Sequence, residues 1–261
     1  ASMVLAEAML RALPAILTGK KLATTVMFPN SSMAMVENIY NNNALANHFN
    51  DILADLVFAY LDQRRQQDPG ATVRLFEIGA GTGGTSAVIF QILSGAEKQQ
   101  IQEYCYSDLS KAFLMHAEAN YGRDNPFLRY HIFNAALPVE PQSGIEAGTY
   151  DVVIATNVLH ATRNIEQTLR NAQALLKPHG VLLLHELAQN SLFLHLTFGL
   201  LEGWWLFEDA PLRIPGSPAL APATWQQVLA RLNFANIAFP AQAQHAFGLQ
   251  IIVAQNALLG S

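Results

Sequence analysis

Apolar residues recur every three or four positions through the first quarter of the chain, which predicts helices there. A second apolar series covers residues 39–60, and residues 28–32, with a proline among them, separate it from the first. A polar turn at residues 66–70 ends the second series. The pattern predicts a helical N-terminal subdomain, or lid, over residues 1–70. The residues that share one face of its first helix are Leu5, Met9 and Leu13.

From residue 73 onward, short apolar runs alternate with helical patterns, as in a parallel sheet whose strands are joined by helices. Two later runs follow each other without room for a helix, so we expect them to pair antiparallel. The fold class predicted for residues 71–261 is α/β: a Rossmann-like, doubly wound sheet of seven strands with an antiparallel last strand. The predicted strands are residues 73–78, 103–107, 128–133, 150–156, 180–184, 235–240 and 249–254.

The composition indicates what kind of domain this is and which partners are not expected. Of the 261 residues, 51% are hydrophobic and 13% are charged, against about 25% charged residues in typical domains. The chain therefore has ample material for a core and few surface charges, which favours a domain shielded by neighbours in a longer polypeptide. With 15 basic and 20 acidic residues the net charge is −5, so we expect no nucleic-acid partner and no anionic membrane partner.

The longest apolar stretch, residues 187–201, is interrupted by polar side chains and falls short of the roughly 20 residues that span a bilayer. The one cysteine, Cys105, cannot form an internal disulfide, and no cysteines and histidines have the spacing of zinc ligands. The N-terminus also lacks the pattern of a signal peptide. We therefore expect a cytoplasmic protein with no metal.

A glycine-rich loop, residues 79–84, follows the first predicted strand and precedes a helical pattern. Glycines let the backbone approach a ligand closely, and the start of a helix offers free N–H groups. Taken alone the loop is ambiguous, because Gly79, Gly81 and Gly84 also satisfy the dinucleotide-binding pattern GxGxxG. A tight turn with no ligand is a further interpretation.

Two acidic residues favour a ligand at this loop. Glu77 lies inside the first strand, where a carboxylate is costly unless backbone donors or a ligand hold it. Asp108 follows the second strand, where a carboxylate can accept hydrogen bonds from both hydroxyls of a ribose. The alternative for Asp108 is that it caps the helix predicted at residues 110–119.

His160 and Glu186 follow the fourth and fifth strands. These strands are neighbours in the predicted sheet, about 4.8 Å apart, and their carboxyl ends meet at the edge where such folds bind ligands. A carboxylate bonded to one imidazole nitrogen raises the basicity of the other, so the pair suits a general base. Lone histidines are more often structural, and the following ones are interpreted so: His48, His116, His131, His179, His195 and His245.

The order Glu-x-Gly-x-Gly-x-Gly, with an acid at the end of the second strand, resembles the S-adenosylmethionine-binding motif of class I methyltransferases. The antiparallel end of the sheet agrees with that family. Asn134 stands where the family often has Asp beside the adenine, and an Asn amide can donate and accept hydrogen bonds there. The residues to which the resemblance assigns cofactor binding are Glu77, Gly79, Ala80, Gly81, Gly83, Asp108, Leu109, Asn134 and Asn157.

Five segments together give a narrower resemblance, to the carbon-methyltransferase domains of modular polyketide synthases, especially trans-acyltransferase assembly lines. The segments are residues 28–32, 36–40, 77–85, 157–162 and 196–205. In that family a His/Glu pair deprotonates the α-carbon of a β-ketoacyl thioester on an acyl carrier protein, and the enolate takes the methyl of S-adenosylmethionine. His160 and Glu186 fall on those positions. The resemblance implies a carrier protein and neighbouring synthase domains as partners.

An aromatic segment after the fifth strand, residues 198–207, is a candidate wall for an acyl pocket. An ordinary core helix is the alternative. The residues assigned to substrate are Tyr40, Leu200, Trp204 and Trp205, with Tyr40 and the asparagines at 41–43 closing as a lid or only packing. Three polar residues near this wall are interpreted as a solvated rim: Glu202, Asp209 and Arg213.

Three rival functions remain open from the sequence. Oxygen methylation in the same assembly-line family also needs a base, so the His/Glu pair permits it. An inactive module that only binds the carrier domain is a second rival, against which the intact glycines and dyad argue. A nicotinamide dehydrogenase is a third, and the antiparallel end of the sheet disfavours it.

Overall fold

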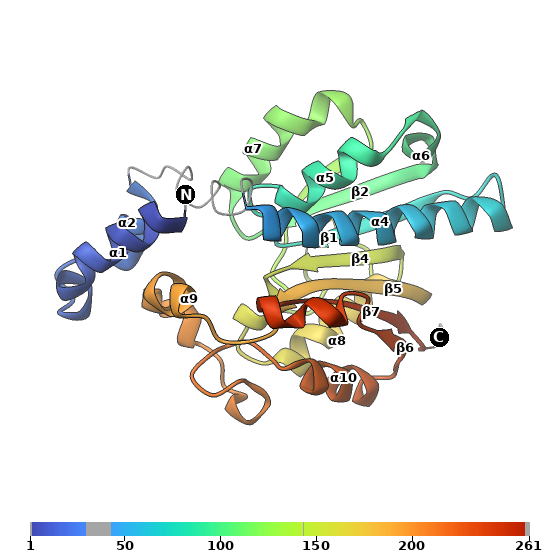
Figure 1. The fold of residues 1–261 in the computed structure, drawn as a ribbon. Coiled ribbons are helices and arrows are strands. Elements are labelled where there is room, and N and C mark those ends of the chain that lie inside the picture. The colour runs from blue at the N-terminus through green and yellow to red at the C-terminus, as the bar shows by residue number, and fades with distance from the viewer. Residues whose placement is uncertain (1, 30–42, 143, 259–261) are drawn as a thin grey trace.

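The computed structural model describes residues 2–29, 43–142 and 144–258. At its centre lies one seven-stranded sheet in the order β3-β2-β1-β4-β5-β7-β6 (Figure 1). The first five strands are parallel, and β7 runs antiparallel to both β5 and β6. The predicted fold is therefore confirmed. The strands are β1 (Val73–Ile78), β2 (Ile101–Asp108), β3 (Leu128–Ile132), β4 (Tyr150–Thr156), β5 (Leu176–Leu187), β6 (Phe234–Ala238) and β7 (Leu249–Asn256).

Helices cover both faces of the sheet (Figure 1). One face packs against α4 (Ala44–Gln67) and α5 (Gly84–Ile92), and the other packs against α8 (Ile165–Leu175) and α10 (Pro222–Arg231). The strands β1 and β4 carry buried apolar side chains toward both layers, as strands covered on both sides must. Further helices in the connections are α6 (Gly95–Gln100), α7 (Lys111–Tyr121) and α9 (Leu192–Leu196).

The N-terminal helices pack against two different parts of the molecule. α1 (Ser2–Leu17) and α2 (Ala23–Met27) pack together through Leu5 and Met9 and rest on the segment that follows α9. α4 instead packs on the sheet, although the proposed N-terminal subdomain includes it. Among the described residues no helix is both long and apolar enough to cross a membrane.

The start of β5 differs from the prediction. Lys177, Pro178 and Gly180 resemble the end of a helix followed by a turn, yet β5 begins at Leu176 and includes them. The register with β4 shifts there, from Tyr150 opposite Leu176 to Val152 opposite Val181. His179 takes a positive φ of 64° at this irregularity. A bulge thus absorbs residues whose local preference is for a turn.

The carboxylate of Glu77, in β1, is buried inside the protein. Its Oε2 accepts hydrogen bonds from the hydroxyls of Ser86 and Tyr104, the latter at 2.7 Å. Burial raises the pKa of Glu77 to about 7, and the two hydroxyls oppose this rise. The folded protein therefore holds this proton to higher pH than the unfolded chain does. Between about pH 4.5 and 7 the free energy of unfolding falls as pH rises, because the buried carboxylate becomes charged.

Replacement Glu77→Gln removes this buried charge while keeping the shape of the side chain. We expect the melting temperature of the variant, relative to the wild type, to be higher at pH 8 than at pH 5, and scanning fluorimetry across pH measures it. Glu140→Gln, the same change at an exposed position, is the matched control and should give a constant difference. A pH-independent difference for Glu77→Gln would contradict the assignment.

Candidate active site

The carboxyl ends of β1, β2, β4 and β5 meet at one edge of the sheet, because these strands are parallel and adjacent. The glycine loop follows β1, Asp108 ends β2, His160 lies just beyond β4, and Glu186 lies near the end of β5. The fold therefore gathers residues from four separate parts of the sequence at the edge where doubly wound sheets bind ligands.

The backbone of the glycine loop requires glycine at alternate positions. Gly79, Gly81 and Gly83 have φ values of 63°, 58° and 83°, whereas Gly84, the first residue of α5, is not among the positive-φ residues. A Cβ on Gly79 would meet a methyl of Val158 at 2.5 Å, and one on Gly83 would meet the ring of Tyr121 at 2.7 Å. The structural requirement thus follows the spacing 79, 81 and 83 rather than GxGxxG.

Asp108 ties the glycine loop to the end of β2. Its Oδ2 accepts from the backbone N–H of Gly81 at 3.0 Å, and its Oδ1 accepts from that of Ser110 at 2.8 Å. Burial raises its pKa, and these backbone bonds oppose the rise. α7 begins at Lys111 with Ser110 as its N-cap, so Asp108 is not that helix's cap. Each carboxylate oxygen keeps a second lone pair for a ligand donor.

The remaining predicted cofactor residues line the same edge. Ala80 donates its backbone N–H to Ser107 at 2.9 Å, and Leu109 exposes 65% of its surface beside Asp108. Asn134 uses its Oδ1 to accept from Ala136, while its backbone is held by Gln142. Asn157 has a positive φ of 52°, and its buried Oδ1 has no partner among the described residues.

His160 and Glu186 are in direct contact. Nδ1 of His160 is hydrogen-bonded to Oε2 of Glu186, which is fully buried. The other carboxylate oxygen, Oε1, accepts from the backbone N–H of Leu159 at 2.8 Å and from that of Val158 at 3.3 Å. Because a carboxylate only accepts, Nδ1 carries a proton, and in the neutral imidazole Nε2 is then the nitrogen with the lone pair. Within the described part of the chain Nε2 has no hydrogen-bond partner.

The candidate substrate residues separate in the structure. Trp204 is buried, with its ring edge-on to the imidazole of His160 at 6.1 Å between centroids. Trp205 is 49% exposed and donates Nε1–H to the carbonyl of Gly199 at 2.8 Å. Leu200 packs with α1 and α2. Residues 198–205 form short 3₁₀ turns, so the core-helix alternative is wrong. Tyr40 lies outside the described residues, as do Asn41 and Asn42.

Two residues interpreted as solvated rim instead have largely inaccessible side chains: that of Arg213 is 1% exposed and that of Asp209 is 10% exposed. Arg213 and Asp209 pair with each other beneath the turn that carries His160, whereas Glu202 is exposed as expected. Sequence analysis missed them because a charged residue in a connection is usually solvated. The available signal was a pair of opposite charges four residues apart in a chain with few charges.

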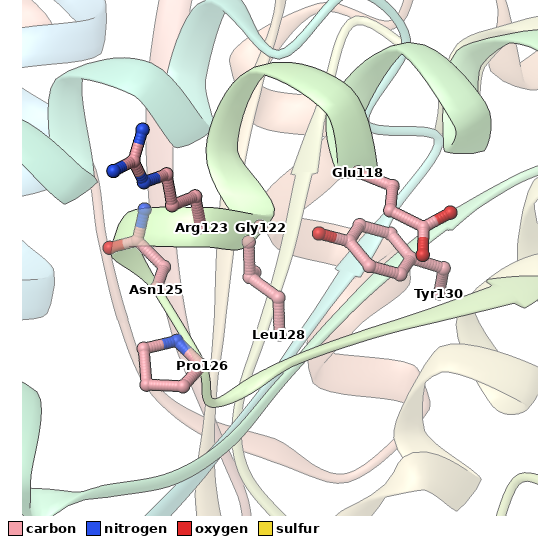
Figure 2. A pocket seen from close by; sticks show the side chains of 7 residues that line it. All are labelled: Glu118, Gly122, Arg123, Asn125, Pro126, Leu128 and Tyr130. Carbon is pink, nitrogen blue, oxygen red and sulfur yellow. The ribbon is translucent and has the colours of Figure 1, made fainter.

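No group of three or more potential metal ligands occurs among the described residues. The hollow shown in Figure 2, about 290 Å³, lies between the end of α7 and the start of β3, at the opposite end of the strands from His160. Glu118, Arg123 and Tyr130 line it, and none belongs to the candidate site.

Comparison with known proteins places the chain in a family. A model described as "Methyltransferase domain" matches residues 76–182. Two polyketide synthases of Bacillus subtilis (strain 168), PksM and PksR, are each 57% identical to this chain over 256 residues, 98% of its length. The chain covers only 6% and 10% of those two proteins.

Solved structures of methyltransferases also match this chain. The DszA carbon methyltransferase matches with a TM-score of 0.91 and 35% identity, over 100% of this chain and 67% of that one. The CurJ carbon methyltransferase matches with a TM-score of 0.89 and 33% identity, over 98% and 67%. The trans-methyltransferase CalH, solved in complex with SAH, matches with a TM-score of 0.72 and 28% identity, over 95% and 65%. The chain belongs to the S-adenosylmethionine-dependent carbon-methyltransferase domains of polyketide synthases.

Proposed function

We propose that this domain transfers a methyl group from S-adenosylmethionine to the α-carbon of a β-ketoacyl thioester carried by an acyl carrier protein. The observation that carries the proposal is the hydrogen bond between His160 and the buried Glu186 at the sheet edge beside the glycine loop. That pairing occupies Nδ1, so the neutral imidazole would have Nε2 available to remove an α-proton.

The residues present fit the cofactor. Gly79, Gly81 and Gly83 carry no side chain, so a ligand can approach the loop's backbone closely, and Asp108 keeps lone pairs for ribose hydroxyls. Asn157, just after β4, adds a buried acceptor that has no partner among the residues the structure describes. When bound, S-adenosylmethionine supplies an electrophilic methyl group on a sulfonium.

The side chains of this domain contribute acid–base catalysis and the alignment of the reacting atoms. Nε2 of His160 takes the α-proton, and the electron pair of the broken C–H bond passes into the enolate of the thioester. Glu186 stabilises the resulting imidazolium and fixes the ring through Nδ1. The α-carbon would then form its bond to the methyl as the methyl–sulfur bond breaks, with that electron pair left on the sulfur of S-adenosylhomocysteine. The enzyme must hold the reacting atoms within about 3 to 3.5 Å. Trp204 beside the imidazole excludes water from this side.

A carrier protein and neighbouring synthase domains are the proposed partners. The matched relatives are polyketide synthases, and the chain spans a tenth or less of PksM and PksR. A domain of that origin acts on acyl groups delivered by a carrier. Its location in the cytoplasm stays a prediction.

Product analysis tests the reaction directly. A β-ketoacyl carrier protein incubated with the domain and S-adenosylmethionine should gain one methyl by intact-protein mass spectrometry, and fragmentation of the ejected pantetheine arm should place it on the α-carbon. A methyl on oxygen, or none despite measured cofactor binding, would overturn the proposal in favour of oxygen methylation or a module without turnover.

The dyad predicts separate effects on turnover and on cofactor affinity. His160→Ala should lower turnover by at least about 10²-fold and leave the affinity for S-adenosylmethionine nearly unchanged, because it removes only the base. Glu186→Gln should be intermediate, since the imidazole remains without its anionic partner. Steady-state kinetics and calorimetry measure both. His179→Ala, at an exposed position at the other end of β5, is the control. Near-normal turnover of His160→Ala would refute the assigned role.

The glycine loop predicts a loss of cofactor affinity. Gly79→Ala should weaken S-adenosylmethionine binding by at least about 10-fold, because the new Cβ meets Val158 and the positive φ costs roughly 1–2 kcal/mol. Isothermal titration measures the change. Gly95→Ala is a matched control, because its Cβ would meet nothing within 4 Å. Equal affinities of both variants would show that the loop does not hold the cofactor.

A further inference from the structure

The turn that carries His160 is short and only weakly held by its own bonds. It consists of one 3₁₀ turn, Leu159–Ala161, after the positive-φ residue Asn157. Its internal bonds run from Ala161 to the carbonyl of Val158 and from Thr162 to that of Leu159. Neither uses the carbonyl of His160 itself. So short a turn does not by itself fix the direction of an imidazole.

The side chain of Arg213 supplies what the turn lacks. Its Nη1 donates to the carbonyls of His160 and Pro218, each at 2.7 Å, and its Nη2 donates to the carbonyl of Thr162 at 3.0 Å. Its Nε and the second proton of Nη2 go to the two oxygens of Asp209, at 2.6 and 3.0 Å. All five N–H donors of the guanidinium thus have one acceptor each. The side chain is 1% exposed.

Asp209 completes the arrangement. Besides neutralising Arg213, its Oδ2 accepts from the backbone N–H of Ile165 at 2.7 Å, at the first residue of α8. The pair therefore connects three places: the turn after β4, the start of α8, and the segment from Asp209 to Pro218. Removing either partner would leave a buried charge unpaired, which is strongly destabilising.

We infer that Arg213 and Asp209 are positioning residues that hold the His160 turn so that the imidazole meets both Glu186 and the substrate. The inference rests on the proposed function, in which His160 is the base. The guanidinium bonds the carbonyl of His160, while Glu186 bonds its ring and the N–H of Leu159. Proton transfer is sensitive to such placement, since a shift of about 1 Å can cost about 10²-fold in rate.

The fork of the guanidinium is essential to this role. A lysine at 213 has three donors on one atom and cannot reach four separate groups, so Arg213→Lys keeps the charge and loses the geometry. A second ion pair joins the same two segments: Arg163 and Glu208 at 2.7 Å, with side chains 61% and 65% exposed. Arg163→Met therefore removes a charge from the same turn without touching the buried contacts, and serves as the matched control.

The test separates proton removal from methyl transfer. A β-ketobutyryl pantetheine thioester in D₂O, with S-adenosylhomocysteine present, reports α-hydrogen exchange: the C–H bond breaks, His160 takes the proton, and a deuteron from solvent replaces it. For Arg213→Lys and Asp209→Asn we expect the enzyme-dependent exchange rate and kcat to fall together by at least about 10-fold. KM and the affinity for S-adenosylmethionine should stay within about threefold of the wild type. Arg163→Met should match the wild type in all four.

Cofactor affinity and melting temperature identify variants that fold. If Arg213→Lys fails to fold, the isosteric Asp209→Asn decides, and a folded variant with wild-type exchange overturns the inference. The inference is also overturned if KM rises and kcat and cofactor affinity fall by equal factors, because such a result indicates a general structural role. His160→Ala is measured in parallel: if it exchanges normally, the proposed function fails, whereas if it alone is inactive, only the positioning role fails.

Discussion

A carboxylate without access to water needs hydrogen-bond donors for its oxygens, and the site depends on one such carboxylate. Glu186 is fully buried, and its two oxygens accept from the ring of His160 and from the backbone N–H groups of Val158 and Leu159. The same side chain thus orients the imidazole and shapes the turn on which that imidazole stands. If the turn moved, Glu186 would lose its hydrogen-bond donors, and the imidazole would lose the bond that fixes its direction. The turn that carries His160 and the His160–Glu186 pair are therefore one structural unit.

The sheet makes this unit possible. Parallel β4 and β5 bring Thr156 opposite His185, so the chain leaving β4 passes directly over Glu186. The turn then reaches back to the glycine loop, because Val158 occupies the space that a Cβ on Gly79 would need. The segment predicted to hold the cofactor and the segment that carries the proposed base are in van der Waals contact. Glycine at 79 consequently matters for both, through packing as well as through its backbone conformation.

The strands and the dyad could be predicted from the sequence because both follow from periodic patterns. Alternating apolar runs predict parallel strands, the order of the strands makes β4 and β5 neighbours, and residues after their ends must meet. The start of β5 could not be predicted, since Pro178 and Gly180 favour a turn locally and only pairing with β4 overrides that preference. Arg213 was missed for a different reason. Its partners are mostly backbone carbonyls, which every residue has, so no side-chain pattern marks them.

If His160 is the base, as we propose, a cation placed near it would disfavour its protonated form, because like charges repel. The structure resolves this by giving Arg213 its own counter-ion. Asp209 binds the guanidinium through both oxygens, so the buried pair is neutral as a whole and acts on the turn through hydrogen bonds rather than through net charge. Glu186 then remains the charged partner of His160. Glu186 thus bonds the imidazole and the N–H groups of the turn, whereas Asp209 neutralises the guanidinium that bonds the turn's carbonyls, and each carboxylate has a single cationic or potentially cationic partner.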